Sequence, residues 1–259
     1  MQTHKVIDHI VGWLDAYCAD AGMTGFVVGV SGGIDSAVTS TLCAKTERET
    51  LALNLPIYQD SRQERLAAEH IRRLENKFPA VRGVDLDLTP VFGAIQQTFP
   101  REIQDDLTMA NSRSRLRMLV AYAFASHHGM LVAGTGNKVE DFGVGFFTKY
   151  GDGGVDLSPI GDLMKSEVYA VAKALGISEA IVEATPTDGL WPDNRSDESQ
   201  LGATYEELEW AMGFDEEDRD ESSLNFRQKQ VLDIYRRFHR SNQHKLAPIP
   251  VCKIPAAFK

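Results

Sequence analysis

The chain has 259 residues and a formal net charge of −10, from 27 basic and 37 acidic side chains. This length is enough for one large domain with a full core, and the acidic balance argues against general nucleic-acid binding, which needs a basic surface to neutralise phosphates. No apolar stretch is long enough for a signal peptide or a membrane span, and the three cysteines form no Cys-x-x-Cys pair, so we expect a reduced, cytoplasmic protein with no membrane partner.

Short apolar strands alternate with amphipathic helices as far as residue 135. The expected elements in chain order are a helix over 6–17, a strand over 26–30, a helix over 36–45, a strand over 50–55, a helix from 61 to about 77, a strand over 81–88, a helix starting at 89, a helix over 108–128 and a strand over 130–133. This alternation predicts an α/β fold, a doubly wound parallel sheet flanked by helices. Ligands of such sheets bind beyond the carboxyl ends of the strands.

The second half of the chain is less regular. Residues 137–163 and 185–203 are rich in glycine, aspartate or proline and have no clear period, which indicates lids, binding loops or disordered segments. Between and after them we expect a helix over 165–176, a helix that starts at a capping box of Thr204 and Glu207, and a basic amphipathic helix near 223–240. Ser61 and Glu64 predict a similar capping box for the helix that starts at 61.

The strongest motif is a glycine-rich turn between a strand and a helix. It consists of Gly29, Val30, Ser31, Gly32, Gly33, Ile34, Asp35 and Ser36. Glycines let the backbone approach phosphate oxygens, and the N–H groups at the following helix N-terminus favour an anion. The lysine of a Walker A loop is missing. Since a carboxylate inside an anion-binding loop needs a cation between it and the phosphates, Asp35 is predicted to be a magnesium ligand.

This motif resembles the pyrophosphate loop of the N-type ATP pyrophosphatases, which have an adenine nucleotide alpha hydrolase-like fold and adenylate their substrates. Downstream segments resemble those of NAD synthetases. The similar segments are 111–118, 134–140, 147–156, 165–169, 186–191 and 244–245. The resemblance spans nearly the whole chain and implies one NAD synthetase domain over 1–259. Because the motif starts at residue 29, no room remains upstream for a glutaminase (amidase) domain, and we expect ammonia as the nitrogen donor.

The resemblance also implies roles for single residues. ATP would bind at residues 29–36 and at Thr135, Lys165 and Thr187, and Mg²⁺ at Asp35 and Glu140. Deamido-NAD would bind at Arg115, Lys149, Asp156, His244 and Lys245. Asp35, Lys165 and Asp152 would take part in catalysis, Asp152 by assisting a metal or orienting ammonia. From the residues alone, Arg113, Arg115 and Arg117 are also consistent with an exposed basic face, and His244 and Lys245 with a solvent-exposed tail.

The implied reaction is the ATP-dependent amidation of deamido-NAD to NAD through an acyl-adenylate, with release of pyrophosphate and then AMP. The members resembled are homodimers, and the helices at 6–17 and 108–128 are candidates for the interface. Three alternatives stay open. They are amidation of nicotinic acid mononucleotide, another ligase of the same superfamily that makes GMP or modifies tRNA, and a nucleotide-binding regulatory module without catalysis.

Overall fold

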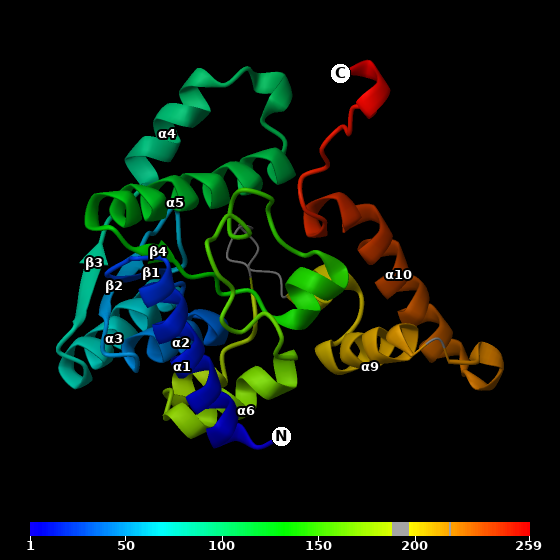
Figure 1. Cartoon of the computed structure of the whole chain (residues 1–259), viewed down its shortest axis with the longest axis horizontal. Coiled ribbons are helices and arrows are strands. Elements are labelled where there is room, and N and C mark those ends of the chain that lie inside the picture. The colour runs from blue at the N-terminus through cyan, green and yellow to red at the C-terminus, as the bar shows by residue number, and fades with distance from the viewer. Residues whose placement is uncertain (188–196, 218) are drawn as a thin grey trace.

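The computed structural model describes residues 1–187, 197–217 and 219–259. In this part of the chain the centre is a four-stranded parallel sheet with the strand order β3-β2-β1-β4 (Figure 1). The strands are β1 (Gly25–Gly29), β2 (Glu49–Asn54), β3 (Val81–Asp85) and β4 (Leu131–Val132). Val27 of β1 lies opposite Leu51 of β2 on one side and Val132 of β4 on the other.

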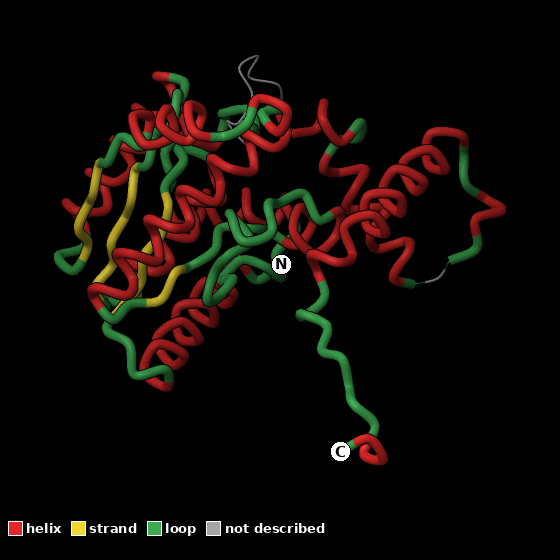
Figure 2. The backbone as a smooth tube through the Cα atoms, turned by 90° about the horizontal axis from the view of Figure 1, so that it is seen from above, coloured by secondary structure: helices red, strands yellow, loops and turns green. Residues whose placement is uncertain are grey.

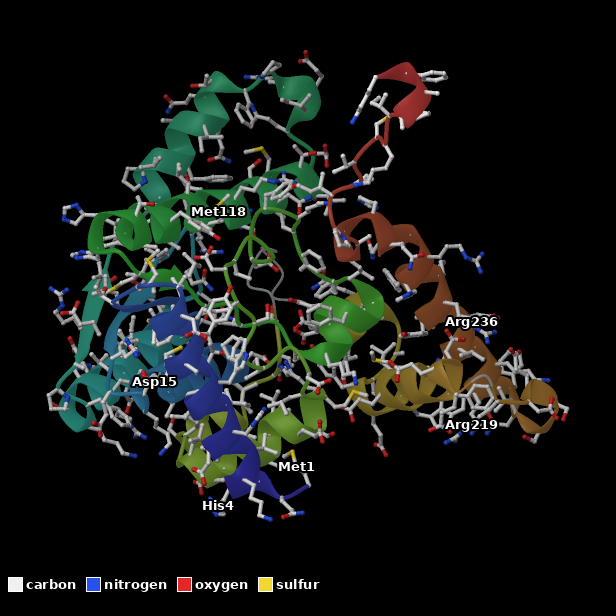
Figure 3. The ribbon with its side chains drawn as sticks, viewed as in Figure 1. Met1, His4, Asp15, Met118, Arg219 and Arg236 are labelled. Atoms are coloured by element: carbon white, nitrogen blue, oxygen red, sulfur yellow. The ribbon has the colours of Figure 1, made fainter. Side chains whose placement is uncertain are left out.

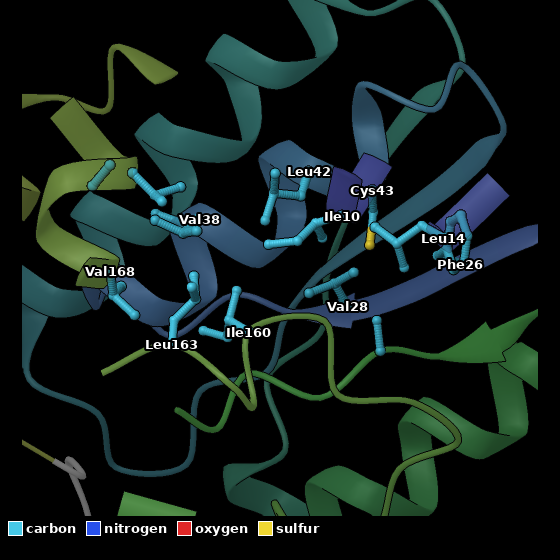
Figure 4. Close-up of a cluster of buried hydrophobic side chains, with 14 of the residues drawn as sticks. Ile10, Leu14, Phe26, Val28, Val38, Leu42, Cys43, Ile160, Leu163 and Val168 are labelled. Carbon is cyan, nitrogen blue, oxygen red and sulfur yellow. The ribbon is translucent and has the colours of Figure 1, made fainter. Parts of the chain in front are cut away.

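Helices cover both faces of the sheet, which confirms the predicted α/β fold (Figure 1). One face carries α1 (Thr3–Asp20), α2 (Ile34–Ala44), α3 (Ser61–Lys77) and α6 (Lys165–Leu175), and the other carries α4 (Thr89–Thr98) and α5 (Asp106–His128). Phe26 and Val28 of β1 pack with Leu14 of α1, Val38 of α2 and Val168 of α6 (Figure 4). Alternation along β1 sends Val27 to the opposite face, against α5.

Several observed boundaries differ from the expected ones by a few residues, and two of them concern the region around α3 and β3. The N-cap of α3 is Asp60 and not Ser61, because the Asp60 carboxylate accepts a hydrogen bond of 2.8 Å from the backbone N–H of Arg62. β3 ends at Asp85, three residues before the expected end. Both differences leave the order of the elements unchanged, since caps and strand ends depend on local hydrogen bonds.

A second helical layer packs beside the sheet domain. It contains a π-helical segment, η2 (Lys138–Val144), and the hairpin of α9 (Tyr205–Glu216) and α10 (Phe226–Leu246) (Figures 1 and 2). These elements share their own hydrophobic cluster. Arg236 of α10, labelled in Figure 3, forms an ion pair of 2.6 Å with Asp215 of α9 and a second of 2.7 Å with Glu221. The capping box predicted for Thr204 and Glu207 is confirmed.

α10 is longer than expected. The helix continues to Leu246, so His244 and Lys245 lie in its last turn and not in a polar tail. The remaining helical segments are α7 (Glu179–Val182), α8 (Asp197–Leu201), η1 (Arg101–Ile103), η3 (Glu221–Ser223) and η4 (Ala256–Phe258). After α10 the chain extends away from the body of the molecule (Figure 2). Among the residues described, no helix is long and apolar enough to cross a bilayer.

A buried histidine joins two helices on one face of the sheet. His70 of α3 is 4% exposed, and its Nε2 lies 3.0 Å from the Ser40 hydroxyl of α2. The Ser40 hydroxyl in turn donates to the carbonyl of Ser36, at 2.7 Å. Burial lowers the pKa of His70 to about 4. His70 is therefore neutral near pH 7 and ties α3 to the first turn of α2.

We expect this histidine to make the protein less stable in mild acid. Its pKa is about 4 when folded and about 6.5 when unfolded, so the unfolded chain binds the proton more tightly. The contribution is present above pH 6.5 and is lost as the pH falls towards 4, by about 3 kcal/mol in all. Urea unfolding of wild type and His70→Gln between pH 7 and pH 4 measures it. Parallel pH curves for the two proteins would contradict the assignment.

Candidate active site

A cavity of about 790 Å³ opens beyond the carboxyl ends of β1, β2 and β4. All eight residues from Gly29 to Ser36 line it. It is also lined by Thr135, which follows β4, by Lys165 at the start of α6, and by Thr187. The cavity thus lies where ligands of doubly wound sheets bind.

The glycine-rich turn is held by its own hydroxyl groups. The Ser31 hydroxyl accepts a hydrogen bond of 3.2 Å from the Gly33 N–H, and the Ser36 hydroxyl donates to the Gly33 carbonyl at 2.9 Å. Gly33 is the N-cap of α2, and no side chain caps this helix. The first N–H groups of α2 therefore lie at the cavity without a side-chain cap, which is an arrangement suited to binding an anion.

Lys165 lies at the centre of a charged cluster that borders this turn. Its Nζ is 2.7 Å from Oδ2 of Asp35 and 2.9 Å from Oε1 of Glu140. Lys165 is 2% exposed, and its partners are separated from it by 130 and 25 positions in the chain. The fold thus brings the starts of α2 and α6 and the segment η2 to one point.

The two carboxylates keep the lysine charged in spite of its burial. Burial alone lowers the pKa of Lys165, but Asp35 and Glu140 raise it well above its ordinary value. Lys165 is the first residue of α6, where a cation opposes the helix dipole. The carboxylates offset that repulsion here. The result is a fixed cation beside the phosphate loop.

Two further residues complete the cluster, and sequence reasoning missed both. Asn137 donates to Oδ1 of Asp35 at 3.0 Å, and its own oxygen accepts from the Glu140 N–H at 3.1 Å. Tyr205 of α9 donates its hydroxyl proton to Glu140. Burial and then Glu140 raise the pKa of Tyr205, so the phenol stays protonated. Asn137 lies inside one of the similar segments, which was a usable signal, whereas nothing in the sequence marked Tyr205.

Asp152 lies at another part of the cavity wall. Its Oδ1 accepts from the Ser114 hydroxyl at 2.6 Å and from the Thr148 N–H at 3.0 Å. Asp152 lines the cavity and is exposed to it, while the protein packed around the carboxylate raises its pKa by desolvation. Asp141, which also lines the cavity, has a pKa raised by burial and then by Asp152. This wall can therefore accept or share a proton.

Asp35 and Glu140 are suited to a hard divalent cation. Both are carboxylates that line the cavity beside the phosphate loop, and Mg²⁺ binds through one or two carboxylates together with substrate phosphates and water. Across residues 1–187, 197–217 and 219–259, no group of three or more histidine, cysteine, aspartate or glutamate side chains is arranged to hold a metal alone. The donor set therefore fits Mg²⁺ that arrives with a phosphate ligand.

A sequence profile for the family described as NAD synthase matches residues 6–249. The chain belongs to the NAD synthase family. Within that family, the NH₃-dependent NAD⁺ synthetase of Carboxydothermus hydrogenoformans is 35% identical to it, over 92% of this chain and 93% of that protein. The enzyme of the same name from Methanosarcina acetivorans is 33% identical, over 97% of this chain and 98% of its own length.

The fold is shared with solved structures of related enzymes. The structure of NMN synthetase from Francisella tularensis superposes with a TM-score of 0.83 at 30% identity and covers 99% of both chains. The family membership expected from the motifs is thereby confirmed, as is the N-type ATP pyrophosphatase fold. The roles of single residues stay predictions.

In the structure, the residues predicted to bind ATP all line the cavity, whereas among those predicted to bind deamido-NAD only Lys245 does so. Lys245 lines the cavity, donates to the carbonyls of Gly145 at 2.5 Å and Phe147 at 2.7 Å, and has a pKa lowered by burial. Asp156 instead accepts from the Tyr122 hydroxyl at 2.9 Å and from the Val132 N–H at 2.8 Å.

The other three predicted substrate residues form a separate chain of contacts outside the cavity lining. Arg115 donates to the carbonyl of Lys149 at 3.3 Å, and the Lys149 ammonium donates to the carbonyl of His244 at 2.6 Å. Arg115 and His244 are exposed. Part of the similar segment 186–191 falls outside the residues that the structure describes.

Proposed function

We propose that the protein catalyses the ATP-dependent amidation of deamido-NAD to NAD by ammonia, through an acyl-adenylate. The chain is a ligase of the NAD synthase family that forms a carbon–nitrogen bond. The observation that carries the proposal is the buried Lys165 cation, which lies beside the phosphate loop and between the carboxylates of Asp35 and Glu140. This arrangement supports cleavage of ATP to AMP and pyrophosphate.

In the first step, an oxygen of the nicotinate carboxylate attacks the α-phosphorus of ATP. An O–P bond forms, the bond from the α-phosphorus to the bridging oxygen breaks, and pyrophosphate leaves. The N–H groups at the start of α2 and the Lys165 ammonium stabilise the charge that develops on the leaving group. Because these groups are already in place, they need no rearrangement during the reaction. Mg²⁺ held by Asp35 and Glu140 would neutralise further phosphate charge.

In the second step, ammonia attacks the acyl carbon, and AMP leaves with the pair of electrons of the C–O bond that breaks. The nitrogen loses a proton in forming the amide. Asp152 faces the cavity with a raised pKa and is held by Ser114 and Thr148, so we assign it the role of orienting ammonia. The wall near Asp152 and Asp141 is suited to receive the released proton.

The experiment that tests this function measures NAD by mass from deamido-NAD, ATP, Mg²⁺ and either ammonium or glutamine. We propose a single synthetase domain over 1–259 and expect product with ammonium, with little from glutamine. A parallel reaction with nicotinic acid mononucleotide tests the alternative substrate. Faster turnover of the mononucleotide would overturn the assignment of deamido-NAD, and pyrophosphate release that no carboxylate substrate stimulates would overturn the activity.

We further propose that the protein is a homodimer. Exposed apolar side chains on α5, Leu107 and Leu119 at 61% each, support a covered surface there. The contacts of Arg115, Lys149 and His244 lie outside the cavity lining, which suits a substrate site completed by a second copy. Sedimentation at micromolar concentration is expected to show twice the mass of 28.7 kDa. A fully active monomer would contradict the proposal.

The cytoplasm is the compartment that we propose for this activity. Cys18 and Cys43 are free and buried, and burial raises the pKa of both thiols, so they remain unreactive core residues. Reduced thiols of this kind are typical of proteins that fold in a reducing environment.

A further inference from the structure

The Tyr205 side chain contacts three charged side chains at once, two of them in the charged cluster. Its hydroxyl contacts Oε1 of Glu140 and lies 3.2 Å from Oδ2 of Asp197, and its ring centroid is 4.8 Å from the Lys165 Nζ. Tyr205 is 8% exposed and Asp197 is 6% exposed. A residue of the α9–α10 hairpin thus reaches into the phosphate site of the sheet domain.

The chemistry of the phenol limits what these contacts can be. A tyrosine hydroxyl has one proton, so it can donate to only one of the two carboxylates at a time. The closer contact is to Glu140, and a hydrogen bond to a carboxylate is stronger than one between neutral groups. The ring adds a second restraint, because an ammonium over an aromatic face is attracted by the ring electrons. Tyr205 therefore fixes Glu140 and Lys165 relative to each other.

Tyr205 also connects the cluster to the chain that carries Thr187. The backbone N–H of Asp197 donates to the Pro186 carbonyl at 3.1 Å, and the backbone N–H of Tyr205 donates to Oε1 of Glu198 at 2.9 Å. Through the neighbouring residues Asp197 and Glu198, Tyr205 is joined to the segment before Thr187. Both parts line the same cavity.

We propose that Tyr205 is a positioning residue for pyrophosphate. It holds Glu140 and Lys165 in the arrangement that receives the phosphates and joins them to the Thr187 segment. The inference rests on the proposed function, since it assigns Tyr205 a part in binding the leaving group of that reaction. Tyr205 acts through Glu140 and Lys165 and does not itself touch the reacting atoms.

The test separates the hydroxyl from the ring. Tyr205→Phe removes the hydroxyl and keeps the ring, and Tyr205→Leu removes both. Tyr235→Phe is the matched control, because Tyr235 is a buried tyrosine of the same hairpin that stacks on His239 and does not line the cavity. Calorimetric titration with inorganic pyrophosphate and Mg²⁺ gives a dissociation constant without turnover. Initial rates give kcat and the KM of each substrate, and thermal unfolding gives the Tm.

We expect Tyr205→Phe to weaken pyrophosphate binding and to lower kcat by about tenfold each, as the loss of a hydrogen bond to a charged group implies. The KM for deamido-NAD should stay within about twofold, and Tyr205→Leu should weaken pyrophosphate binding further, through the lost ring contact. Tyr235→Phe should match wild type. Equal pyrophosphate affinity for wild type and Tyr205→Phe would overturn the proposal, even if the Tm of the variant fell. Weaker pyrophosphate binding by the variant, with no NAD formed by wild type, would support the positioning role and reject the proposed function.

Discussion

Replacement of Lys165 by methionine is expected to lower the rate of substrate-stimulated pyrophosphate release by roughly 10²–10³-fold, the loss typical for one preorganised charge-stabilising group. Methionine is similar in length to lysine but carries no charge. The Nζ of Lys165 is 2.7 Å from Asp35 and 2.9 Å from Glu140, so the variant leaves these two carboxylates facing each other without their cation. With both carboxylates ionised, the net charge of the cluster changes from −1 to −2, so the leaving pyrophosphate meets more negative charge at the site.

The same change should also destabilise the fold. Removing one partner of a buried ion pair leaves an uncompensated charge, at a cost of about 3–5 kcal/mol. Lys173→Met is the matched control, since Lys173 is an exposed lysine on the same helix, α6. Urea unfolding and pyrophosphate release, measured on both variants, check the prediction. Wild-type rates for Lys165→Met in the presence of saturating ATP would show that the cation plays no part in the chemistry.

The sequence predicted the two ends of this cluster for different reasons. Asp35 was found because a carboxylate inside a phosphate-binding turn needs a cation, which is a local argument. Lys165 is predicted from the resemblance, and a cation at a helix start, where the dipole disfavours it, is consistent with an anionic ligand nearby. Their contact across 130 positions is a property of the fold, since parallel strands bring the starts of their following helices to one edge of the sheet. Glu140 is predicted at the same site from the resemblance to known motifs and not from the sequence pattern alone.

Other parts of the site had no signal in the sequence. The π-helical η2 has no period that a helix pattern detects, so residues 137–163 were expected to be irregular although Lys138–Val144 are helical. The role of Tyr205 in the site could not be predicted, because an aromatic residue at a helix start ordinarily indicates packing. Tyr205 does pack in the hydrophobic cluster of the α9–α10 hairpin. The helix expected over 223–240 ends before His244, whereas the observed helix continues to Leu246. The residues of its last turns are mostly polar and give no apolar pattern from which to predict them.

Gly32→Ala is expected to disable the phosphate loop and destabilise the fold together. Gly32 has φ of +85°, a conformation that side chains rarely adopt, and a Cβ built there would lie 2.4 Å from the backbone carbonyl oxygen of Gln63 in α3. Relieving the clash requires a shift of the backbone of the turn or of α3, because the nearest atom is a backbone oxygen and not the end of a flexible side chain. The strain and the displacement should cost about 2–4 kcal/mol of unfolding free energy.

Activity should fall as well as stability, since a phosphate loop displaced by about 1 Å can lower the rate roughly 10²-fold. Gly213→Ala is the matched control, because it replaces a glycine without creating a steric clash. Gly213 lies within α9, and a Cβ there meets nothing within 4 Å. Alanine at position 213 should stabilise by about 0.5–1 kcal/mol through its better helix propensity. Urea unfolding and pyrophosphate release on both variants measure the contrast. Wild-type turnover by Gly32→Ala would contradict the claim that close packing against α3 sets the position of the phosphate loop.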